Sequence, residues 1–171
     1  MNRTATLILL PLAALLCACS STSTTGTSTA ATFTITPNPA IAVTGTPGWT
    51  YTIVGDATHP DQIIQFPWQT TFTVSMHENA GVGRNITAIA VKVQQSSGGI
   101  VVTPSGTAVE HWDYKSQASS NRLPANGDAS VSFTVAYDLP NKGSEALITI
   151  SFSYVDDNAL AFSESTQVQV H

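Results

Sequence analysis

Strict alternation of apolar and polar residues is the feature that most constrains the fold of this chain. In residues 129–138 every second residue is apolar, and small or polar residues fall between. The apolar set is Val131, Phe133, Val135 and Tyr137. Because successive side chains of a β-strand point to opposite faces, this pattern predicts a strand with one buried and one solvent-facing side. A helix needs apolar residues three or four positions apart, and no such stripe of useful length follows residue 18.

The same pattern recurs from residue 33 to the end of the chain. The further runs are 33–35, 49–53, 68–76, 89–93, 110–114, 145–155 and 160–170. Segments rich in Gly, Pro, Asn and Asp separate them, as in ANGD (125–128) and LPNKG (139–143), which is typical of turns. About seven to nine short strands with polar outer faces predict an all-β domain over residues 33–171, built as two packed antiparallel sheets. A closed barrel is the alternative.

The first 18 residues have the organisation of a secretory signal peptide. A polar start carrying Arg3 precedes the apolar run LILLPLAALL, and the small residue Ala18 follows. The apolar run has ten residues, whereas a helix needs about 20 to span a bilayer. Pro11 within the run also disfavours a long helix. We therefore expect residues 1–18 to be cleaved, with a retained membrane anchor as the alternative.

The end of the apolar run carries a short cysteine motif. The string Leu16-Cys17-Ala18-Cys19 resembles the lipobox of bacterial lipoproteins. In that family the cysteine thiol takes a diacylglycerol and a peptidase cuts just before it. The resemblance implies lipidation of Cys19, a membrane as partner through the N-terminal lipid, and a place in the cell envelope. Ser20 implies, by the sorting rule of the family, the outer membrane of a Gram-negative bacterium. Ordinary cleavage without lipid stays open.

Residues 19–32 have the composition of a tether. The segment SSTSTTGTSTAA (20–31) contains nine Ser or Thr in twelve residues and no large apolar side chain. Such a segment cannot bury enough surface to offset the entropy of ordering. We expect a flexible linker between the lipidated Cys19 and the β domain.

Charge and cysteine content exclude several classes of function. Eleven acidic residues against six basic ones give a net charge of −5, and the basic residues form no stripe. Nucleic-acid binding therefore has no electrostatic support. Both cysteines lie at or before the expected cleavage site, which leaves the folded part without disulfides, thiol catalysis or cysteine–metal sites. We expect no cofactor.

The histidines and serines do not indicate an enzyme. The four histidines lack the fixed spacing of zinc ligands and are read as isolated surface or strand-end residues; they are His59, His77, His111 and His171. No Gly-x-Ser-x-Gly nucleophile elbow is present. We therefore expect a non-catalytic protein.

A short acidic segment near the C-terminus is the one candidate metal site. Asp156, Asp157 and Asn158 place three oxygen-bearing side chains side by side. With backbone carbonyls they would suit a calcium ion. The alternative is an Asx-rich turn between the last two strands.

Two groups of large side chains are candidates for a contact surface. Trp112 and Tyr114 flank an aspartate, which suits a carbohydrate or protein contact, with packing at the rim of the core as the alternative. Ile63, Ile64 and Phe66 lie outside the regular pattern and either cover a sheet edge or form an exposed patch.

The segment HENAGVGRNITAIAVKV (77–93), a Gly-containing turn between two core strands, resembles bacterial immunoglobulin-like and fibronectin type III-like envelope domains. The Cys–Trp–Cys signature of antibody domains is absent. The resemblance implies an immunoglobulin-like β-sandwich that acts as a binding or structural module, with a protein or carbohydrate partner bound by loops at one end. A periplasmic inhibitor or chaperone of this shape is the alternative, because Pro37-Asn38-Pro39 and Gly81-Val82-Gly83 resemble loop motifs of such inhibitors. A small hydrolase is a third reading.

Overall fold

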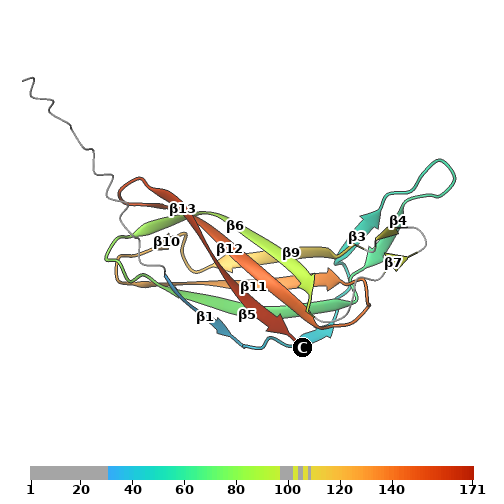
Figure 1. Cartoon of the computed structure of the whole chain (residues 1–171), viewed down its shortest axis with the longest axis horizontal. Coiled ribbons are helices and arrows are strands. Elements are labelled where there is room, and N and C mark those ends of the chain that lie inside the picture. The colour runs from blue at the N-terminus through green and yellow to red at the C-terminus, as the bar shows by residue number, and fades with distance from the viewer. Residues whose placement is uncertain (1–30, 97–101, 104–105, 108) are drawn as a thin grey trace, which may run out of the picture.

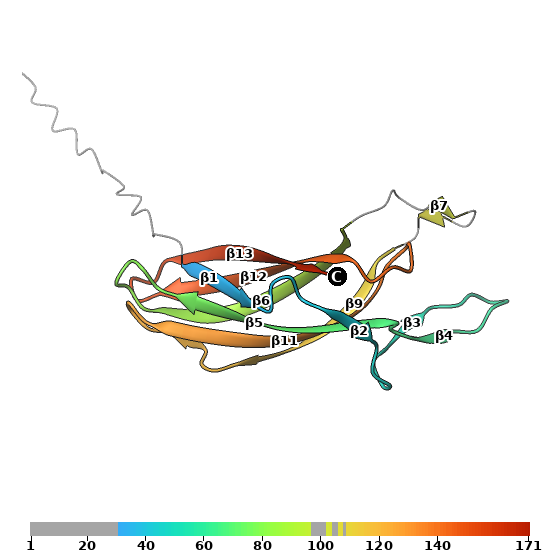
Figure 2. The ribbon, with the colours of Figure 1, turned by 90° about the horizontal axis from the view of Figure 1, so that it is seen from below.

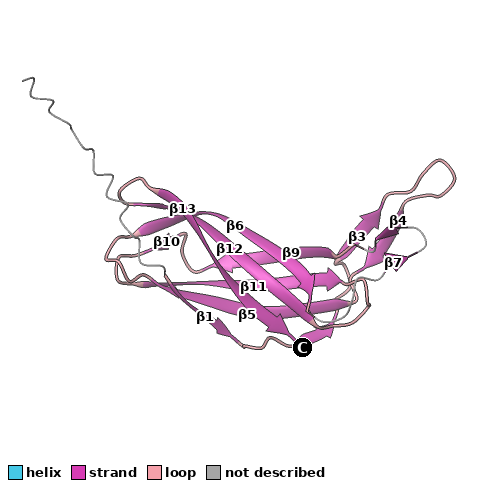
Figure 3. Ribbon diagram, in the orientation of Figure 1, coloured by secondary structure: helices cyan, strands magenta, loops and turns pink. Residues whose placement is uncertain are grey.

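The computed structural model describes residues 31–96, 102–103, 106–107 and 109–171 (Figure 1). The predicted signal peptide, Cys19 and nearly all of the predicted tether lie outside these residues. Within the described ranges the chain forms strands and loops, and no helix (Figure 3). The strands are β1 (Thr32–Thr36), β2 (Ala42–Thr44), β3 (Thr50–Ile53), β4 (Gln62–Gln65), β5 (Trp68–His77), β6 (Arg84–Gln95), β7 (Val102–Thr103), β8 (Gly106–Thr107), β9 (His111–Ala118), β10 (Arg122–Leu123), β11 (Asp128–Asp138), β12 (Ala146–Asp156) and β13 (Ala161–Val170).

Two antiparallel sheets face one another and form a sandwich. The first has the order β1-β5-β11-β9, with β2 also paired to β5, and the second has the order β10-β6-β12-β13. Nine strands therefore belong to the two sheets, and the prediction of an all-β antiparallel sandwich is confirmed. The four other described strands form two hairpins outside these sheets, β3–β4 and β7–β8.

The alternation in the sequence sets the register of the sheets. In the first sheet Phe133 lies opposite Phe72, and their rings stack with centroids 5.4 Å apart. In the second sheet Ile150 lies opposite Val91, and both are buried. A slip by one residue would turn these side chains to solvent, so the pattern fixes the pairing. Each fully buried Phe or Ile contributes about 1.5–3 kcal/mol, so the core between the sheets holds the fold.

Side chains from β9 cover the exposed edge of β6. The indole Nε1 of Trp112 donates to the carbonyl oxygen of Val91 at 3.0 Å, and the hydroxyl of Tyr114 donates to that of Ile89 at 2.8 Å. These two residues thus pack at the rim of the core and connect the two sheets. Packing at the rim was the alternative to a carbohydrate or protein contact in the sequence analysis. Trp112 is still 36% exposed.

The opposite side of the sandwich is closed by backbone hydrogen bonds. β1 and β2 follow one another along the same edge of β5. The segment between them pairs with the end of β13: Ala40 N–H donates to Gln169 O at 2.8 Å, and Ala42 N–H to His171 O at 2.8 Å. Figure 2 shows β1 beginning at one end of the sandwich, whereas the β3–β4 hairpin projects from the other end.

Candidate binding surface

The β3–β4 hairpin is an insertion between β2 and β5 that projects beyond the sandwich (Figure 1). Its register places Tyr51 opposite Ile64 and Thr52 opposite Ile63. Among the described residues, neither strand pairs with any strand besides its partner. An isolated two-stranded hairpin is marginally stable in water, so its position depends on how its base is attached.

Tyr51 anchors the base of the hairpin. Its ring stacks on His111 with centroids 4.2 Å apart and lies 5.0 Å from the ring of Phe66. Its hydroxyl donates to Asp138 Oδ2 at 2.8 Å. Burial, the hydrogen bond to Asp138 and the negative charge of Asp138 together raise the pKa of Tyr51 to about 12, and burial is the largest cause. The phenol therefore stays a protonated donor at neutral pH.

A second small core surrounds this anchor. Phe66 is 1% exposed although it lies outside the main core cluster between the sheets. The Nζ of Lys115 lies 4.7 Å from the ring centroid of Trp49, a cation–π geometry. Gly45 lies close to the backbone of Phe66, because a Cβ at position 45 would be 2.0 Å from the carbonyl oxygen of Phe66. The base of the hairpin is thus packed against the sandwich, and only the tip is free.

The tip of the hairpin combines apolar exposure with negative charge. Val54 is 80% exposed, Ile63 is 74% exposed and Ile53 is 45% exposed. The two charged residues of the hairpin, Asp56 and Asp61, are both acidic. Exposed apolar side chains gathered on one projection are typical of a contact surface.

Hydrogen bonds organise the turn at this tip. Asp56 Oδ1 accepts from the N–H of Thr58 at 2.7 Å and from the N–H of His59 at 2.9 Å. Asp61 Oδ1 accepts from Gly55 N–H at 2.8 Å. Hydrogen bonds from Thr58 and then His59 lower the pKa of Asp56 to about 2, so this carboxylate is ionised at neutral pH.

This turn does not have the geometry of a hydrolytic triad. Thr58 Oγ1 and Asp56 Oδ1 both lie against the same ring atom, Nδ1 of His59, at 2.9 and 3.1 Å. A triad needs the carboxylate on Nδ1 and the nucleophile on Nε2. The arrangement orders the turn at the tip of the hairpin.

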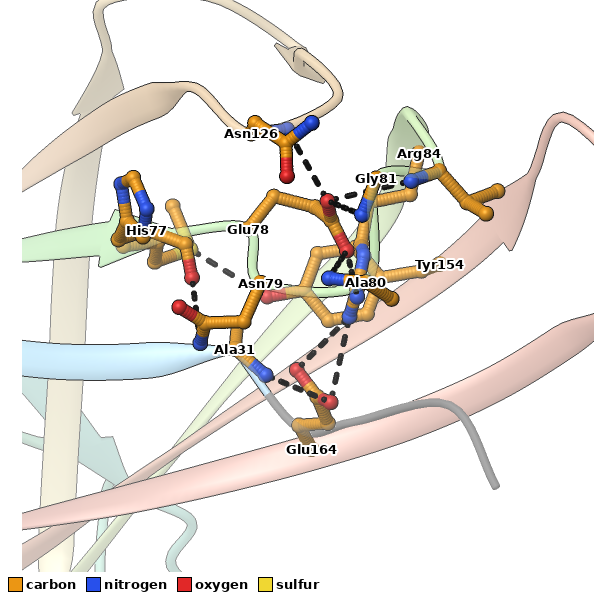
Figure 4. Close-up of polar contacts among 12 residues, drawn as sticks. Ala31, His77, Glu78, Asn79, Ala80, Gly81, Arg84, Asn126, Tyr154 and Glu164 are labelled. Atoms are coloured by element: carbon orange, nitrogen blue, oxygen red, sulfur yellow. Dashed lines mark hydrogen bonds and ion pairs between the residues drawn. The ribbon is translucent and has the colours of Figure 1, made fainter. Parts of the chain in front are cut away.

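A buried ion pair (Figure 4) lies at the turn from β5 to β6, at the end of the sandwich opposite to the β3–β4 hairpin (Figure 1). Arg84 Nη2 donates to Glu78 Oε1 at 2.8 Å, and the two side chains are 1% and 0% exposed. Glu78 also accepts the backbone N–H groups of Ala80, Gly81, Val82 and Asn126 at 2.7–3.2 Å. Burial alone would raise the pKa of Glu78, but these donors and Arg84 outweigh it and hold the pKa at about 2.

The same arginine ties the first residues of the sandwich to the last strand. Arg84 Nη1 donates to Glu164 Oε1 at 3.2 Å, and its guanidinium lies 4.9 Å from the ring centroid of Phe162 and 5.5 Å from that of Tyr154. Glu164 Oε1 also accepts the N–H of Ala31 at 3.2 Å. Each of these contacts joins two segments of the chain at this end of the sandwich, so we assign the cluster a role in stabilising the fold there.

The sequence did not predict this cluster. The segment from Glu78 to Arg84 reads as a polar turn, and nothing in its composition indicates burial. The available signal was Glu164, which interrupts the alternation of β13 on the side that faces the core. A charge at an inward position of a strand implies a buried partner.

The candidate calcium residues lie in the turn between β12 and β13. Asp156 Oδ1 accepts the N–H groups of Asn158 and Leu160, both at 2.9 Å, which forms an Asx turn. Asp157 turns instead to Arg122, with its Oδ2 2.8 Å from Nη2. In the described ranges no three residues of the His, Cys, Asp and Glu types are grouped to hold a metal ion. The calcium site stays a prediction.

The other predicted site residues are spread over the molecule. His77 meets Asp128 at 2.8 Å at the end with the ion pair, whereas His59 and His111 lie in and under the hairpin. The predicted apolar patch divides: Ile63 is exposed, and Phe66 is buried in the hairpin base. Cys19 lies outside the described residues.

In comparisons with known proteins, no family model matches the chain, and no curated protein matches it either. In the part of the chain that the structure describes, no helix has the length and apolarity to cross a bilayer.

Proposed function

We propose that the chain is a lipid-anchored protein of the cell envelope whose non-catalytic β-sandwich presents the β3–β4 hairpin to a protein or carbohydrate partner. The observation that carries this proposal is the attached base and exposed tip of that hairpin. Tyr51 fixes the base, and the tip leaves Val54 and Ile63 largely in solvent. The hairpin projects from the end of the sandwich opposite to the one at which β1 begins (Figure 2).

The strand order supports an immunoglobulin-like assignment. Counting β1 with β2 as strand A, and leaving out β10 and the two hairpins, the remaining strands are B to G in chain order. The sheets then read A-B-E-D and C-F-G, the order of immunoglobulin constant-type domains. Such sandwiches host many functions, so the function is argued from the hairpin and not from the fold.

The N-terminal sequence supports the anchor. A signal-like segment, Cys19 in a lipobox-like string and a Ser/Thr-rich tether follow one another. One acyl chain binds a membrane only marginally, whereas two or more anchor a protein stably. By the sorting rule of lipoproteins, Ser20 directs the protein to the outer membrane of a Gram-negative cell.

The anchor is tested by replacing single cysteines in the full chain. We expect Cys19→Ser to move the protein from the membrane fraction to the soluble envelope fraction, whereas the matched control Cys17→Ser stays with the membrane. Mass spectrometry of the membrane-bound protein should find an acylated N-terminal Cys19. Retention of Cys19→Ser in the membrane, with an unmodified N-terminus in the parent protein, would contradict the proposal.

A second candidate function is a periplasmic inhibitor, which the projecting tip also favours because a narrow hairpin can enter the cleft of an enzyme. Capture from envelope extracts separates the two. One enzyme bound stoichiometrically, with its activity lost, supports the inhibitor. Binding to several envelope components without loss of activity supports the display module.

A further inference from the structure

The edges of the sandwich at β6, β9 and β13 are protected against pairing with other strands. Unpaired strand edges are templates for aggregation, and proteins cover, charge or bend them. Trp112 and Tyr114 cover the carbonyl groups of β6, and Lys115 places a charge on β9. β13 carries the inward charge of Glu164 and is bridged at its end by Ala40.

The β3–β4 hairpin lacks these protections. Neither strand contains a charged residue or a proline, and β4 reads QIIQ. In an antiparallel pair, alternate residues turn their N–H and C=O groups away from the partner strand. β4 pairs only with β3 among the described residues, so its outer edge offers such groups beside the exposed Ile63. An open, apolar edge in a protein whose edges at β6, β9 and β13 are protected indicates a binding site.

Charge selects the kind of occupant. Asp61 directly precedes β4, and Asp56 lies in the same tip, so the edge ends in negative charge. A second copy of the hairpin would bring the same two carboxylates, and the whole chain carries a net charge of −5. A strand with a basic residue near the tip is complementary, whereas self-pairing is not.

We propose that the outer edge of β4 binds an extended segment of a partner protein as an added strand. This inference rests on the proposed function, because it names how the hairpin holds its partner. The partner segment alternates apolar and polar residues, sets an apolar side chain against Ile63, and carries Lys or Arg beside Asp56 and Asp61. Main-chain hydrogen bonds supply affinity in such strand addition, and side chains on alternate positions supply specificity. An edge of four residues gives a small interface, typical of a weak and reversible contact.

The test uses the purified full chain and the synthetic peptide KTVTVTVTK, which is extended, apolar on one face and basic at its ends. We expect binding with a dissociation constant below about 1 mM by fluorescence anisotropy. Hydrogen–deuterium exchange should show amides of β4 protected about tenfold by the bound peptide. The acidic peptide ETVTVTVTE, and the basic peptide with alternate backbone nitrogens methylated, should each bind about tenfold more weakly.

The matched variants are Ile63→Lys, which protects the edge, and Leu160→Lys, which adds the same charge at an exposed apolar site, 58% exposed, in the β12–β13 turn. We expect the first to weaken peptide binding about tenfold and the second to leave it within about twofold. Equal binding by both variants, protection away from β4, or no binding at about 1 mM would each overturn the inference.

Sedimentation of the full chain tests whether a second copy of the chain, rather than another protein, occupies the edge of β4. A dimer that Ile63→Lys dissociates would overturn the inference in favour of a second copy, whereas a monomer supports it. The strand-addition mode and the proposed display function can fail independently of one another. If the full chain captures an envelope partner that protects other loops and leaves β4 unchanged, the display function stands and the strand-addition mode is wrong.

Discussion

Replacing Glu78 with glutamine removes the negative charge that faces a buried arginine. Both oxygens of Glu78 accept hydrogen bonds: Oε1 from Ala80 N–H and Arg84, and Oε2 from backbone N–H groups that include Gly81. An amide has one oxygen and one NH2 group. Whichever way glutamine turns, its NH2 group meets N–H donors, and Arg84 loses its nearest counter-charge.

The size of the effect follows from the pKa of Glu78. Folding lowers this pKa from 4.5 to about 2, and each unit corresponds to about 1.4 kcal/mol. The carboxylate therefore contributes about 3 kcal/mol to the free energy of unfolding at neutral pH. Removing one partner of a buried ion pair costs about 3–5 kcal/mol in other proteins. We expect Glu78→Gln to lose about 3 kcal/mol at pH 7.

The sign of the pH dependence provides a second check. Because the folded pKa is depressed, the contribution of Glu78 is present above the unfolded value of 4.5 and is lost as the pH falls through about 2. The difference between the parent protein and Glu78→Gln should therefore shrink over this window and largely vanish near its lower end.

Urea unfolding, followed by the fluorescence of the three tryptophans, measures both quantities. The matched control is Asp157→Asn, which breaks the exposed ion pair with Arg122 and should cost much less than Glu78→Gln, because solvent screens exposed pairs. A loss below about 1 kcal/mol for Glu78→Gln, or a difference that stays constant from neutral to acid pH, would refute the reasoning.

Two further substitutions test the attachment of the hairpin and the protected edge. Gly45→Ala places a Cβ 2.0 Å from Phe66 O, so we expect hydrogen exchange in residues 49–66 to rise about tenfold while the core amides stay unchanged; unchanged exchange in the hairpin would contradict the packed base. Tyr114→Phe removes the donor to Ile89 O and should cost about 1 kcal/mol in urea unfolding. It should also speed aggregation seen by light scattering, because the carbonyl oxygen of Ile89 at the edge of β6 loses its partner; a variant as soluble and stable as the parent would contradict that role.

The sandwich strands were readable from the sequence because one face of each is buried. Residues 129–138 predicted β11 almost to its ends, and residues 145–155 predicted β12. Periodicity of two carries this information wherever a core selects one face. It does not say which strands pair, and the division of the strands between sandwich and hairpins came only from the structure.

The hairpin and the ion pair were less accessible for different reasons. The run that ends at Ile53 was recognised as a strand, but it leaves the sandwich because it pairs with β4 and Tyr51 packs on His111. The separation of Ile63 from Phe66 likewise depends on tertiary packing. Glu78 is buried by a turn whose backbone N–H groups converge on it, and no periodicity reports such convergence.

The course of the chain along β5 has a mechanical consequence. β1 and β2 follow one another on the same edge of β5, and β3 comes next in the chain. A pull between Ala31 and the tip of the hairpin would thus travel through a single stretch of covalent backbone. Extended backbone already spans about 3.3 Å per residue and has little length left to give. Tension along this path would load the β1–β5 and β2–β5 backbone hydrogen bonds in shear, and the hydrogen bond from Tyr51 to Asp138 would pass part of the load to the sheets.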